Sequence, residues 1–406
     1  MTPLHDVRVV DLSRVLAGPW SSQILADLGA DVIKVERSGD GDDTRAWGPP
    51  FVNGADGDDL SATYFHATNR GKRSIAVDFN RAEDREVILR LIADADIVIE
   101  NFKVGALKKY GLDYASLSAV NPGLIYCSIT GFGQTGPYAH RPGYDAMIQA
   151  LGGFMAVTGE PDGEPMKVGV AVVDLFTGVY ATTGILAALH ARKSTGRGAH
   201  IDMSLLDVQV GVLANQAASY LISGQPAPRL GNAHPNLAPY QVFAVSDGHL
   251  MIAVGNDGQF ARLCEVLGVE ALAFDPAYRH NPDRVRNRDT LIPLLSAKIA
   301  QRTKAELTAR LEAAGVPVGP INTVPEVFAD PQVIARGMRV DVDSPAAKGG
   351  KVPAVRTPIM INGEPCVADR PAPQLGEHTD EIKKSLDTPG LGVERKRARL
   401  RLSVGG

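Results

Sequence analysis

Residues Val7-Arg8-Val9-Val10-Asp11-Leu12 form a short run rich in β-branched side chains, a pattern typical of a buried strand. A helical pattern over about 19–29 follows it and leads to a second such run at 31–36. The alternation then continues with a predicted helix at about 83–95 and strands at 96–100 and 124–130. Strands that alternate with helices predict βαβ units, a parallel sheet and therefore an α/β fold.

A second, smaller α+β domain is predicted further along the chain. A break rich in Gly and Pro at 224–228 is followed by two alternating runs, 240–245 and 249–254, with a Ser-Asp-Gly turn between them that favours a hairpin. Helices over about 257–267 and 288–314 follow. The predicted division is 1–204 for the N-terminal part of the large domain, 205–228 for a linker helix, 229–325 for the small domain, and 326–406 for a linker and a C-terminal part that returns to the large domain.

Length and composition support this division and narrow the range of partners. A chain of 406 residues exceeds one ordinary core, and 44% hydrophobic with 22% charged residues is typical of a soluble globular protein. The formal net charge of −4 gives no general attraction to nucleic acid. The basic run 395–401 is interpreted as a solvated helix end. We therefore expect no nucleic-acid partner, and any polyanionic ligand needs a local cluster of cations.

Cysteine usage and hydropathy bear on location. Cys127, Cys264 and Cys366 are far apart and odd in number, which indicates neither a disulfide framework nor a metal site. The first residues lack the charged and apolar regions of a signal peptide, and the apolar stretch 179–189 is too short and too interrupted to span a bilayer. We expect a cytoplasmic protein with no bound metal and no membrane partner.

Asp174 is the most informative single residue. It lies between an apolar run, 168–173, which predicts a buried strand, and a helical pattern over 176–192. A carboxylate at such a junction receives the free N–H groups of the helix and the positive end of its dipole, so it can stay ionised with little water around it. Two interpretations are open at this point: a nucleophile, or an ordinary helix cap, a position where Asp is common.

The residues around Asp174 resemble a known family. The order V-V-D-L-x-T-G, helix, T-G-R-G, strand, S-L-L-D extends from 172 to 207. It resembles the class III CoA-transferases, the family of formyl-CoA:oxalate and crotonobetainyl-CoA:carnitine transferases, and the resemblance covers nearly the whole chain. The other family-like segments are 7–19, 30–37, 42–45, 69–75, 98–102, 315–322 and 375–379.

The resemblance implies a fold, an assembly and a reaction. The fold is a Rossmann-like large domain built from N- and C-terminal parts, plus the smaller α+β domain, and the assembly is a homodimer of interlocked rings. The reaction is exchange of a CoA thioester between two carboxylic acids. Asp174 attacks the donor thioester, and an aspartyl-CoA thioester forms before the acceptor acid reverses the steps. CoA is thus a substrate, no tightly bound cofactor is expected, and the nucleophile interpretation of Asp174 is favoured.

The resemblance also implies further site residues. Gly255 and Gly258 correspond to a flexible glycine loop that covers the intermediate, although a tight turn with an Asn or Asp helix cap explains the same residues. Arg37 and Lys109 are the expected phosphate partners of CoA, and Lys109 stands where the family more often has Arg. The implied CoA pocket consists of Leu16, Ala17, Arg37, Val77, Asp78, Phe79, Asn101, Phe102, Lys103 and Lys109.

Two other interpretations use the same fold. The α-methylacyl-CoA racemases have a catalytic His before an Asp where this chain has Tyr144 and Asp145, and a Tyr is unsuited to deprotonate an α-carbon near neutral pH. Tyr144 and Asp145 are therefore expected to line the acyl site, and His140 is the nearby residue that favours a racemase. A catalytically silent acyl-CoA binding protein is the other alternative, and an intact Asp174 argues against it.

A dinucleotide site is also considered. Residues 131–136 match G-x-G-x-x-G after the strand at 124–130, but Pro137 and the loop beyond it follow instead of a helix. We reject NAD binding and expect these glycines to let backbone approach the thioester region.

The acyl specificity is the least determined feature. Segments 42–51, 126–131 and 134–137 look most like the succinyl-CoA:glutarate branch, which implies succinyl-CoA as donor and a dicarboxylic acid as acceptor. The far carboxylate of such a substrate needs a cation. Arg45, Arg141 and Lys167 are the candidates, and the sequence does not choose among them.

Overall fold

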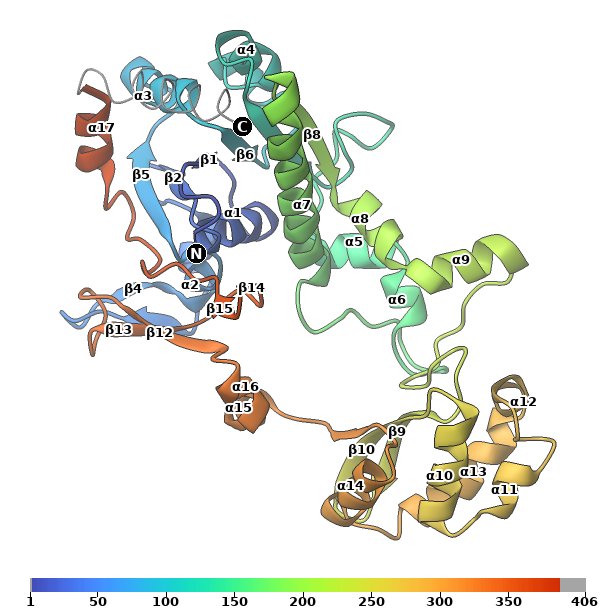
Figure 1. The fold of residues 1–406 in the computed structure, drawn as a ribbon. Coiled ribbons are helices and arrows are strands. Elements are labelled where there is room, and N and C mark those ends of the chain that lie inside the picture. Colours follow the sequence, from blue (N-terminus) through green and yellow to red (C-terminus); the bar gives the residue numbers. More distant parts are fainter. Residues whose placement is uncertain (1, 388–406) are drawn as a thin grey trace. The chain divides into compact units, whose positions relative to one another are not determined.

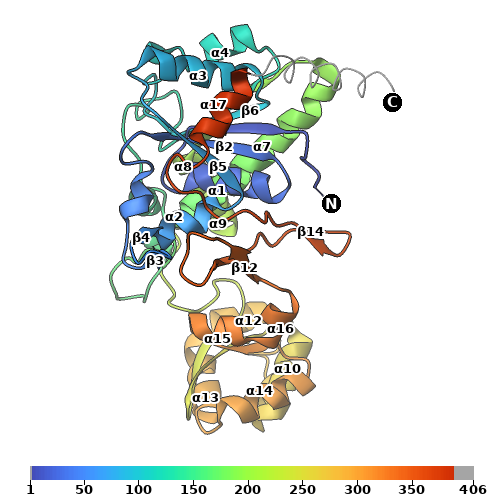
Figure 2. The same ribbon diagram turned by 90° about the vertical axis from the view of Figure 1, so that its left-hand side faces the viewer.

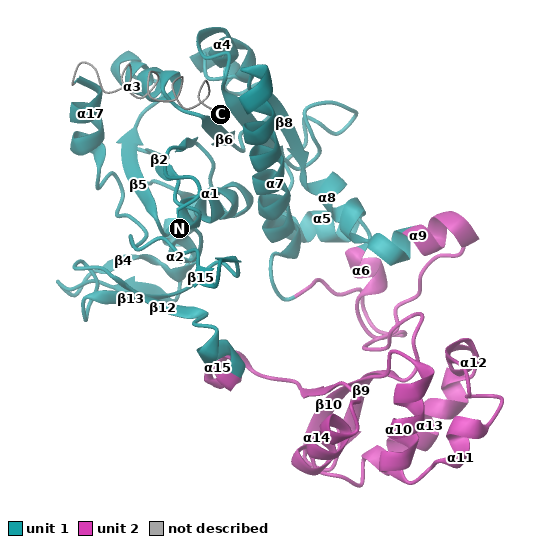
Figure 3. Cartoon of the chain, in the orientation of Figure 1, with its two compact units in different colours: residues 1–153, 169–217, 332–406 teal, residues 154–168, 218–331 magenta. Residues whose placement is uncertain are grey.

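The structure is a computed structural model that describes residues 2–387. It divides into two compact units (Figure 3). The first comprises Met1–Gly153, Gly169–Ala217 and Gln332–Gly406, and the second Phe154–Val168 and Ala218–Pro331. The basic run 395–401 lies outside the described residues. The domain boundaries at 204, 228 and 325 come from sequence and remain predictions.

A six-stranded parallel sheet forms the centre of the first unit (Figure 1). Its order is β5-β2-β1-β6-β7-β8, so the chain builds outward from β1 in both directions, as in a Rossmann fold. The expectation of an α/β fold with a parallel sheet is confirmed. The strands are β1 (Arg8–Asp11), β2 (Asp31–Arg37), β5 (Lys72–Val77), β6 (Ile97–Glu100), β7 (Ile125–Thr130) and β8 (Ala199–Ser204).

Both faces of this sheet are buried. Successive side chains of a strand point to opposite faces, so Val9 and Val10 of β1 enter different cores. Val9 packs with α1 (Ala17–Asp27) and α7 (Val172–Thr195), and Val10 packs on the α3 (Ala82–Ala93) side. Burial of both faces explains why these strands appear in the sequence as unbroken apolar runs.

The C-terminal helix α17 (Thr379–Asp387) lies beside α3 and β5, as two views show (Figures 1 and 2). Ile382 is buried in the same core as α3, and Arg73 of β5 forms an ion pair with Glu381 at 2.9 Å. The C-terminal and N-terminal segments therefore fold as one unit.

Two predictions about the segment near Asp174 are wrong. The run 168–173 is not a buried strand: α7 already begins at Val172, and Val170 is 58% exposed. A short apolar run does not distinguish a strand from the first turn of a helix. The second wrong prediction is that the apolar stretch at 179–189 is too short to span a bilayer. The helix α7 extends well beyond this stretch, and by length and composition alone it is apolar enough to cross a membrane. In this fold it packs along α1, β7 and β8.

The second unit contains an antiparallel sheet of β9 (Tyr240–Val245), β10 (Gly248–Ala253) and β11 (Val318–Pro320), so the predicted hairpin is confirmed. The predicted helix 288–314 is wrong, because α13 (Arg288–Ile299) and α14 (Lys304–Ala313) are separate helices. The break coincides with a cap signal, since the Thr303 side chain accepts a hydrogen bond from the N–H of Glu306.

Shorter elements complete the chain. The helices are α2 (Thr63–Asn69), α4 (Tyr114–Val120), α5 (Asp145–Leu151), α6 (Phe154–Val157), α8 (Leu205–Val212), α9 (Ala214–Ser223), α10 (Asp257–Leu267), α11 (Ala271–Phe274), α12 (Asn281–Arg286), α15 (Val324–Ala329) and α16 (Pro331–Ala335), with single turns at Asp43–Ala46 and Lys108–Tyr110. The remaining strands pair as β3 (Phe51–Asn53) with β4 (Asp59–Ala62), β12 (Arg339–Asp343) with β13 (Lys351–Val355), and β14 (Met360–Ile361) with β15 (Glu364–Pro365).

Close packing of α1 on α7 sets the position of Asp174. A Cβ at Gly178 would lie 2.8 Å from the carbonyl oxygen of Ala17 and against the Trp20 side chain. One turn further along both helices, the Ser21 and Thr182 hydroxyls are 3.0 Å apart. The glycine of the V-V-D-L-x-T-G motif is therefore needed for helix contact, and it brings the start of α1 within one helical turn of Asp174.

We predict that Gly178→Ala lowers the free energy of unfolding by about 1–3 kcal/mol, because the added methyl group overlaps the α1 backbone. Gly184→Ala on the same helix is the control. Its Cβ would meet Ile201 at 3.5 Å, an ordinary contact, and alanine favours helix by up to about 1 kcal/mol. Urea unfolding measures both, and equal effects of the two substitutions would contradict the packing argument.

Candidate active site

Asp174 lies in the first turn of α7 but does not cap it. The cap residue is Ala171, and no side chain of the helix's own start accepts its N–H groups. Instead Asp145, from the start of α5, reaches across. Its Oδ1 accepts hydrogen bonds from the N–H groups of Val173 at 2.8 Å and Asp174 at 3.2 Å. The helix-cap interpretation of Asp174 is wrong, and so is the expectation that Asp174 itself receives these donors.

The Asp174 carboxyl group is therefore poorly stabilised as an anion. Burial, and then the negative charge of Asp145, raise its pKa from 3.8 to about 7. Among residues 2–387 no cation forms an ion pair with it. A carboxylate that is neither capping a helix nor paired with a cation keeps its lone pairs available for attack on a substrate.

An aromatic pair that the sequence did not indicate lies near this carboxyl group. Burial, followed by the charges of Asp174 and Asp145, raises the pKa of the Tyr64 phenol. The ring of Tyr64, at the start of α2, meets that of Trp47 edge-on with centroids 5.4 Å apart. Residue spacing gives no signal for Tyr64, because it is far from Asp174 in the chain and comes near it only in the folded protein.

Of the two residues expected to line the acyl site, Asp145 contacts the backbone of Asp174, and Tyr144 precedes it in the chain. The Asp145 carboxylate is oriented by Gln149, whose Nε2 donates to Oδ2 at 2.6 Å. The Tyr144 side chain is 66% exposed at the start of α5, and His140 is exposed on the preceding loop.

A pocket of about 260 Å³ opens at the carboxyl ends of β1, β2, β5 and β6. This edge includes the point between β1 and β6 where the strand order reverses, the usual ligand site of such sheets. Its lining includes part of the implied CoA set, namely Arg37, Val77, Asp78, Phe79 and Phe102. Arg14, which the sequence analysis did not single out, also lines it, with its guanidinium 5.9 Å from the centre of the Phe102 ring.

The other implied CoA residues are not among those that line this pocket. Leu16 and Ala17 are buried where α1 begins, and Lys103 and Lys109 are exposed. The Asn101 amide is bonded to the Arg14 backbone on both sides, with Oδ1 accepting from N–H at 2.9 Å and Nδ2 donating to the carbonyl at 2.6 Å. Asn101 therefore holds a turn beside the pocket, and its side chain is not free for a ligand.

Of the candidate cations for a far carboxylate, Arg45 is already engaged. Its Nε and Nη2 donate to the Glu36 carboxylate at 2.8 and 2.7 Å, and Nη2 also donates to the Pro373 carbonyl. This bidentate pair is mostly buried, so the structure disfavours Arg45 as a substrate ligand. Arg141 lies over the rings of Phe132 and Tyr138, whereas Lys167 belongs to the second unit.

The glycine segment belongs to the second unit. Asn256 caps α10, accepting from the N–H of Gln259 at 2.9 Å, so the helix-cap interpretation of this segment is confirmed. The Gly255 N–H donates to Gln259 Oε1 at 2.7 Å, and Gly258 lies in the first turn of α10. A role for Gly255 and Gly258 in covering an intermediate remains a prediction.

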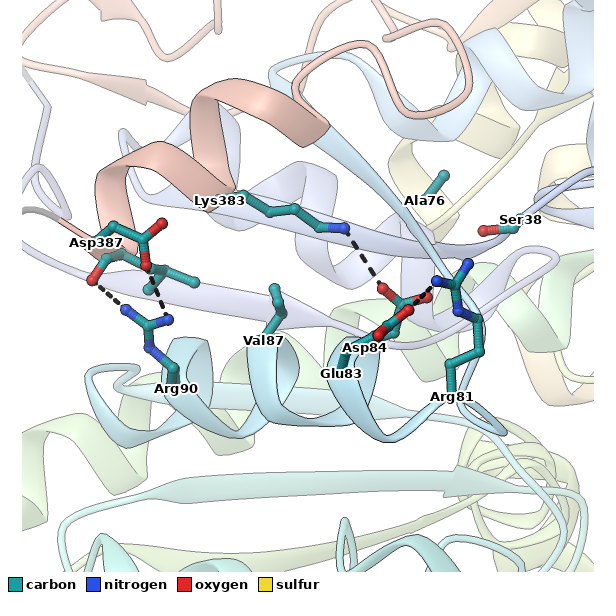
Figure 4. Close-up of a pocket in the computed structure, with 10 residues that line it drawn as sticks. Ser38, Ala76, Arg81, Glu83, Asp84, Val87, Arg90, Lys383 and Asp387 are labelled. Atoms are coloured by element: carbon teal, nitrogen blue, oxygen red, sulfur yellow. Dashed lines mark hydrogen bonds and ion pairs between the residues drawn. The ribbon is translucent and has the colours of Figure 1, made fainter.

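A second, larger pocket of about 460 Å³ lies between α3 and α17 (Figure 4). Its charges pair with one another: Lys383 with Asp84, Arg90 with Asp387, and Arg81 with Glu83. These pairs leave no excess charge for a ligand, and the pocket is better explained as a polar seam between two helices. Among the described residues, no cluster of His, Cys, Asp and Glu is suited to hold a metal ion.

Comparison with known proteins places this geometry in a family. The model of CoA-transferase family III matches residues 4–379. The chain belongs to CoA-transferase family III. Within it, the chain is 57% identical over 387 residues to a succinate–glutarate CoA-transferase of Agrobacterium fabrum, covering 95% of this chain and 96% of that protein. It is 43% identical to the human succinyl-CoA:glutarate CoA-transferase, covering 95% of this chain and 86% of that protein.

Solved structures support the same family membership. A CAIB/BAIF family protein from Brucella suis aligns with a TM-score of 0.84 and 57% identity, over 95% of this chain and all of that one. A protein from Mycobacterium tuberculosis aligns with a TM-score of 0.82 and 31% identity, over 94% and 99%. The chain is thus a class III CoA-transferase, and CoA thioesters are the substrates of its family.

The raised pKa of Asp174 predicts that this residue costs stability above neutral pH. A carboxyl with a folded-state pKa near 7 favours the folded protein below about pH 4, and that contribution is lost as pH rises through 7. Asp174→Asn should therefore raise the free energy of unfolding at pH 8 by roughly 2–4 kcal/mol, and should have little effect near pH 4.

The measurement is thermal or urea unfolding at both pH values. Asp289→Asn is the control, since it removes an exposed carboxyl from the first turn of α13. There the loss of a charge that favours the helix dipole should destabilise slightly. A destabilised Asp174→Asn protein at pH 8 would contradict the electrostatic description.

Proposed function

We propose that this protein transfers CoA from succinyl-CoA to a dicarboxylic acid, with Asp174 as the nucleophile and an aspartyl-CoA thioester as the intermediate. The observation that carries the proposal is the Asp174 carboxyl group, which is buried, forms no ion pair with a described cation, and lies one helical turn from the close contact between α1 and α7. The substrate pair follows the activities named for relatives that are 57% and 43% identical.

The first half of the reaction uses Asp174 twice. A carboxylate oxygen attacks the thioester carbonyl carbon, the C–S bond breaks, and CoA leaves as the thiolate, giving a mixed anhydride. The thiolate then attacks the side-chain carbonyl carbon of Asp174. The anhydride C–O bond breaks, succinate leaves as the carboxylate, and Asp174 carries CoA as a thioester.

The second half repeats these steps with the acceptor acid. Its carboxylate attacks the aspartyl thioester and expels the CoA thiolate, which then attacks the acceptor's acyl carbon and restores the Asp174 carboxylate. Asp145 supports both halves because it binds the N–H groups of the helix start and so fixes the backbone of Asp174. The nearby Tyr64 phenol is a suitable donor to the oxygen that becomes negative.

We place the nucleotide end of CoA in the pocket at the edge of the sheet. Arg14 and Arg37 supply cations there, and Phe79 and Phe102, with ring centres 6.2 Å apart, supply apolar walls. The Arg37 ion pair with Asp40 is exposed, so a phosphate displaces it at small cost. The turn that holds Arg14 leads directly into α1, so the pocket and Asp174 are joined through one rigid segment.

A homodimer accounts for apolar surface that the single chain leaves exposed. Phe176, Val179 and Tyr180 form one exposed face of α7, and at the end of α9 Leu221 and Ile222 are 79% and 88% exposed. Such patches mark protein interfaces. An interlocked pair of identical chains is the arrangement we propose to cover them, and sedimentation analysis of the purified protein tests it.

The racemase alternative remains weaker. Its catalytic His position is taken by Tyr144, and His140 lies exposed on a loop.

The acceptor acid is glutarate in our proposal, with other dicarboxylates as members of the test panel. Cytoplasmic location is proposed from the buried, unpaired state of Cys127, Cys264 and Cys366.

The deciding experiment is chromatography of CoA esters after the protein is mixed with succinyl-CoA and each of several dicarboxylates. A new ester that requires both an acceptor and Asp174 is expected, and Asp174→Ala should lower the rate by at least about 10³-fold. Hydroxylamine added with succinyl-CoA alone should label the peptide that contains Asp174. Deuterium uptake at the α-carbon of a 2-methylacyl-CoA, with no new ester, would instead identify a racemase.

The pH profile tests the assignment of Asp174 more closely. Because the nucleophile must be ionised and its pKa is about 7, kcat/KM for succinyl-CoA should fall as pH drops below 7. Asp145→Asn removes the neighbouring charge and should move this fall to lower pH, whereas Asp289→Asn should leave it unchanged. An acid limb that does not move in Asp145→Asn would show that another group controls it.

A further inference from the structure

The turn between β1 and α1 is held by side chains at nearly every backbone group. One bond is local, from Asp11 of β1, and the others come from distant segments: β2, the loop after β2 and the residue after β6. They are Asp11 Oδ1 to Ser13 N–H (2.9 Å), Lys34 Nζ to the Ser13 carbonyl (3.0 Å), Asn101 to Arg14 N–H and carbonyl (2.9 and 2.6 Å), and Asp42 Oδ1 to Val15 N–H (3.3 Å). The turn is therefore fixed from outside.

Val15 needs such support. Its φ of 71° lies in the left-handed region, which β-branched residues very rarely adopt. A residue in that region persists only where its surroundings enforce it, and such positions concentrate at functional sites. Here the enforced turn leads from Arg14, which lines the pocket, to Leu16 and Ala17 at the start of α1.

Lys34 and Asp42 form the centre of this support. Their side chains are 0% exposed and form an ion pair at 2.8 Å, and each makes a second bond to the turn, Lys34 to Ser13 and Asp42 to Val15. Both also form part of the pocket wall. Because their charged groups are satisfied by each other and by the turn, they are not suited to bind a phosphate directly.

We propose that the buried Lys34–Asp42 pair is a positioning device for CoA, which acts by holding Val15 in the left-handed conformation that keeps the turn from Ser13 to Leu16 open as one wall of the pocket. This inference rests on the proposed function, since it assumes that CoA occupies this pocket. Neither residue touches the reacting atoms. The pair therefore affects the affinity for CoA. It does not affect the affinity for the acceptor acid or the rate of the chemical step.

The test removes both charges together. Single substitutions leave a buried unpaired charge and risk unfolding, whereas Lys34→Met/Asp42→Leu replaces the pair by apolar side chains of similar size. We expect Kd for CoA, measured by calorimetry, and KM for succinyl-CoA to rise by about tenfold or more. We expect KM for the acceptor acid and kcat at saturation to stay within about twofold.

A third substitution separates positioning from general damage. Glycine adopts φ near 70° without strain, so Val15→Gly in the Lys34→Met/Asp42→Leu background should recover most of the lost CoA affinity. Glycine ordinarily lowers stability, so a merely structural role of the pair predicts no recovery or a further loss.

The matched control is Arg70→Met/Asp27→Asn. The Arg70 and Asp27 side chains are also almost fully buried and form an ion pair at 2.6 Å. This pair attaches α1 to the segment after α2, but it does not contact the turn. It should lower the melting temperature without changing CoA affinity. The proposal is overturned if Lys34→Met/Asp42→Leu folds and binds CoA like the wild type, if Val15→Gly gives no recovery, or if the control loses CoA affinity equally. A wild-type protein that neither binds CoA nor makes a new ester would refute the proposed function instead.

Discussion

The buried carboxylate of Asp11 at the end of β1 is the interaction on which the first unit depends. It accepts from Lys72 Nζ of β5 at 3.0 Å, from Ser22 Oγ of α1 at 2.5 Å, and from Ser13 N–H at 2.9 Å. Burial alone would raise the pKa of Asp11, but the charges of Lys72 and Lys34 lower it. A single anion thereby joins the central strand, the edge strand and the first helix, and it can do so only because every lone pair is satisfied.

The same helix then determines the chemistry of Asp174. Because α1 packs tightly against α7 through Gly178, the start of α7 has a fixed position, and Asp145 occupies its N–H groups. Asp174 consequently lacks the stabilisation that a helix start ordinarily provides. A buried, destabilised carboxylate is a better nucleophile than a hydrogen-bonded one, because it has less stabilisation to lose when it attacks. The cost is a lower free energy of unfolding above neutral pH.

The pocket at the sheet edge and the first turn of α7, which carries Asp174, are connected through the segment that begins α1. The turn at Val15 borders the pocket, and the helix that it begins contacts α7 one turn from Asp174. The buried pair of Lys34 and Asp42 fixes the first end, and the contact at Gly178 fixes the second. In our proposal, this arrangement lets the edge of a Rossmann-like sheet, which binds dinucleotides in other proteins, accept an extended CoA thioester.

The alternation of strands and helices and the hairpin of the second unit could be predicted from the sequence, because each depends on local periodicity. The family could be predicted as well, because its motifs are short runs of neighbouring residues. The sequence misjudged the start of α7, the single helix at 288–314 and the role of Arg45, which is bound to Glu36. Three features became visible only in the folded chain: Asp145 accepts the N–H groups at the start of α7, Tyr64 lies near Asp174, and Lys34 and Asp42 support a strained turn. Those features join segments far apart in the chain, and the energies that select them arise from burial and charge after the segments have met.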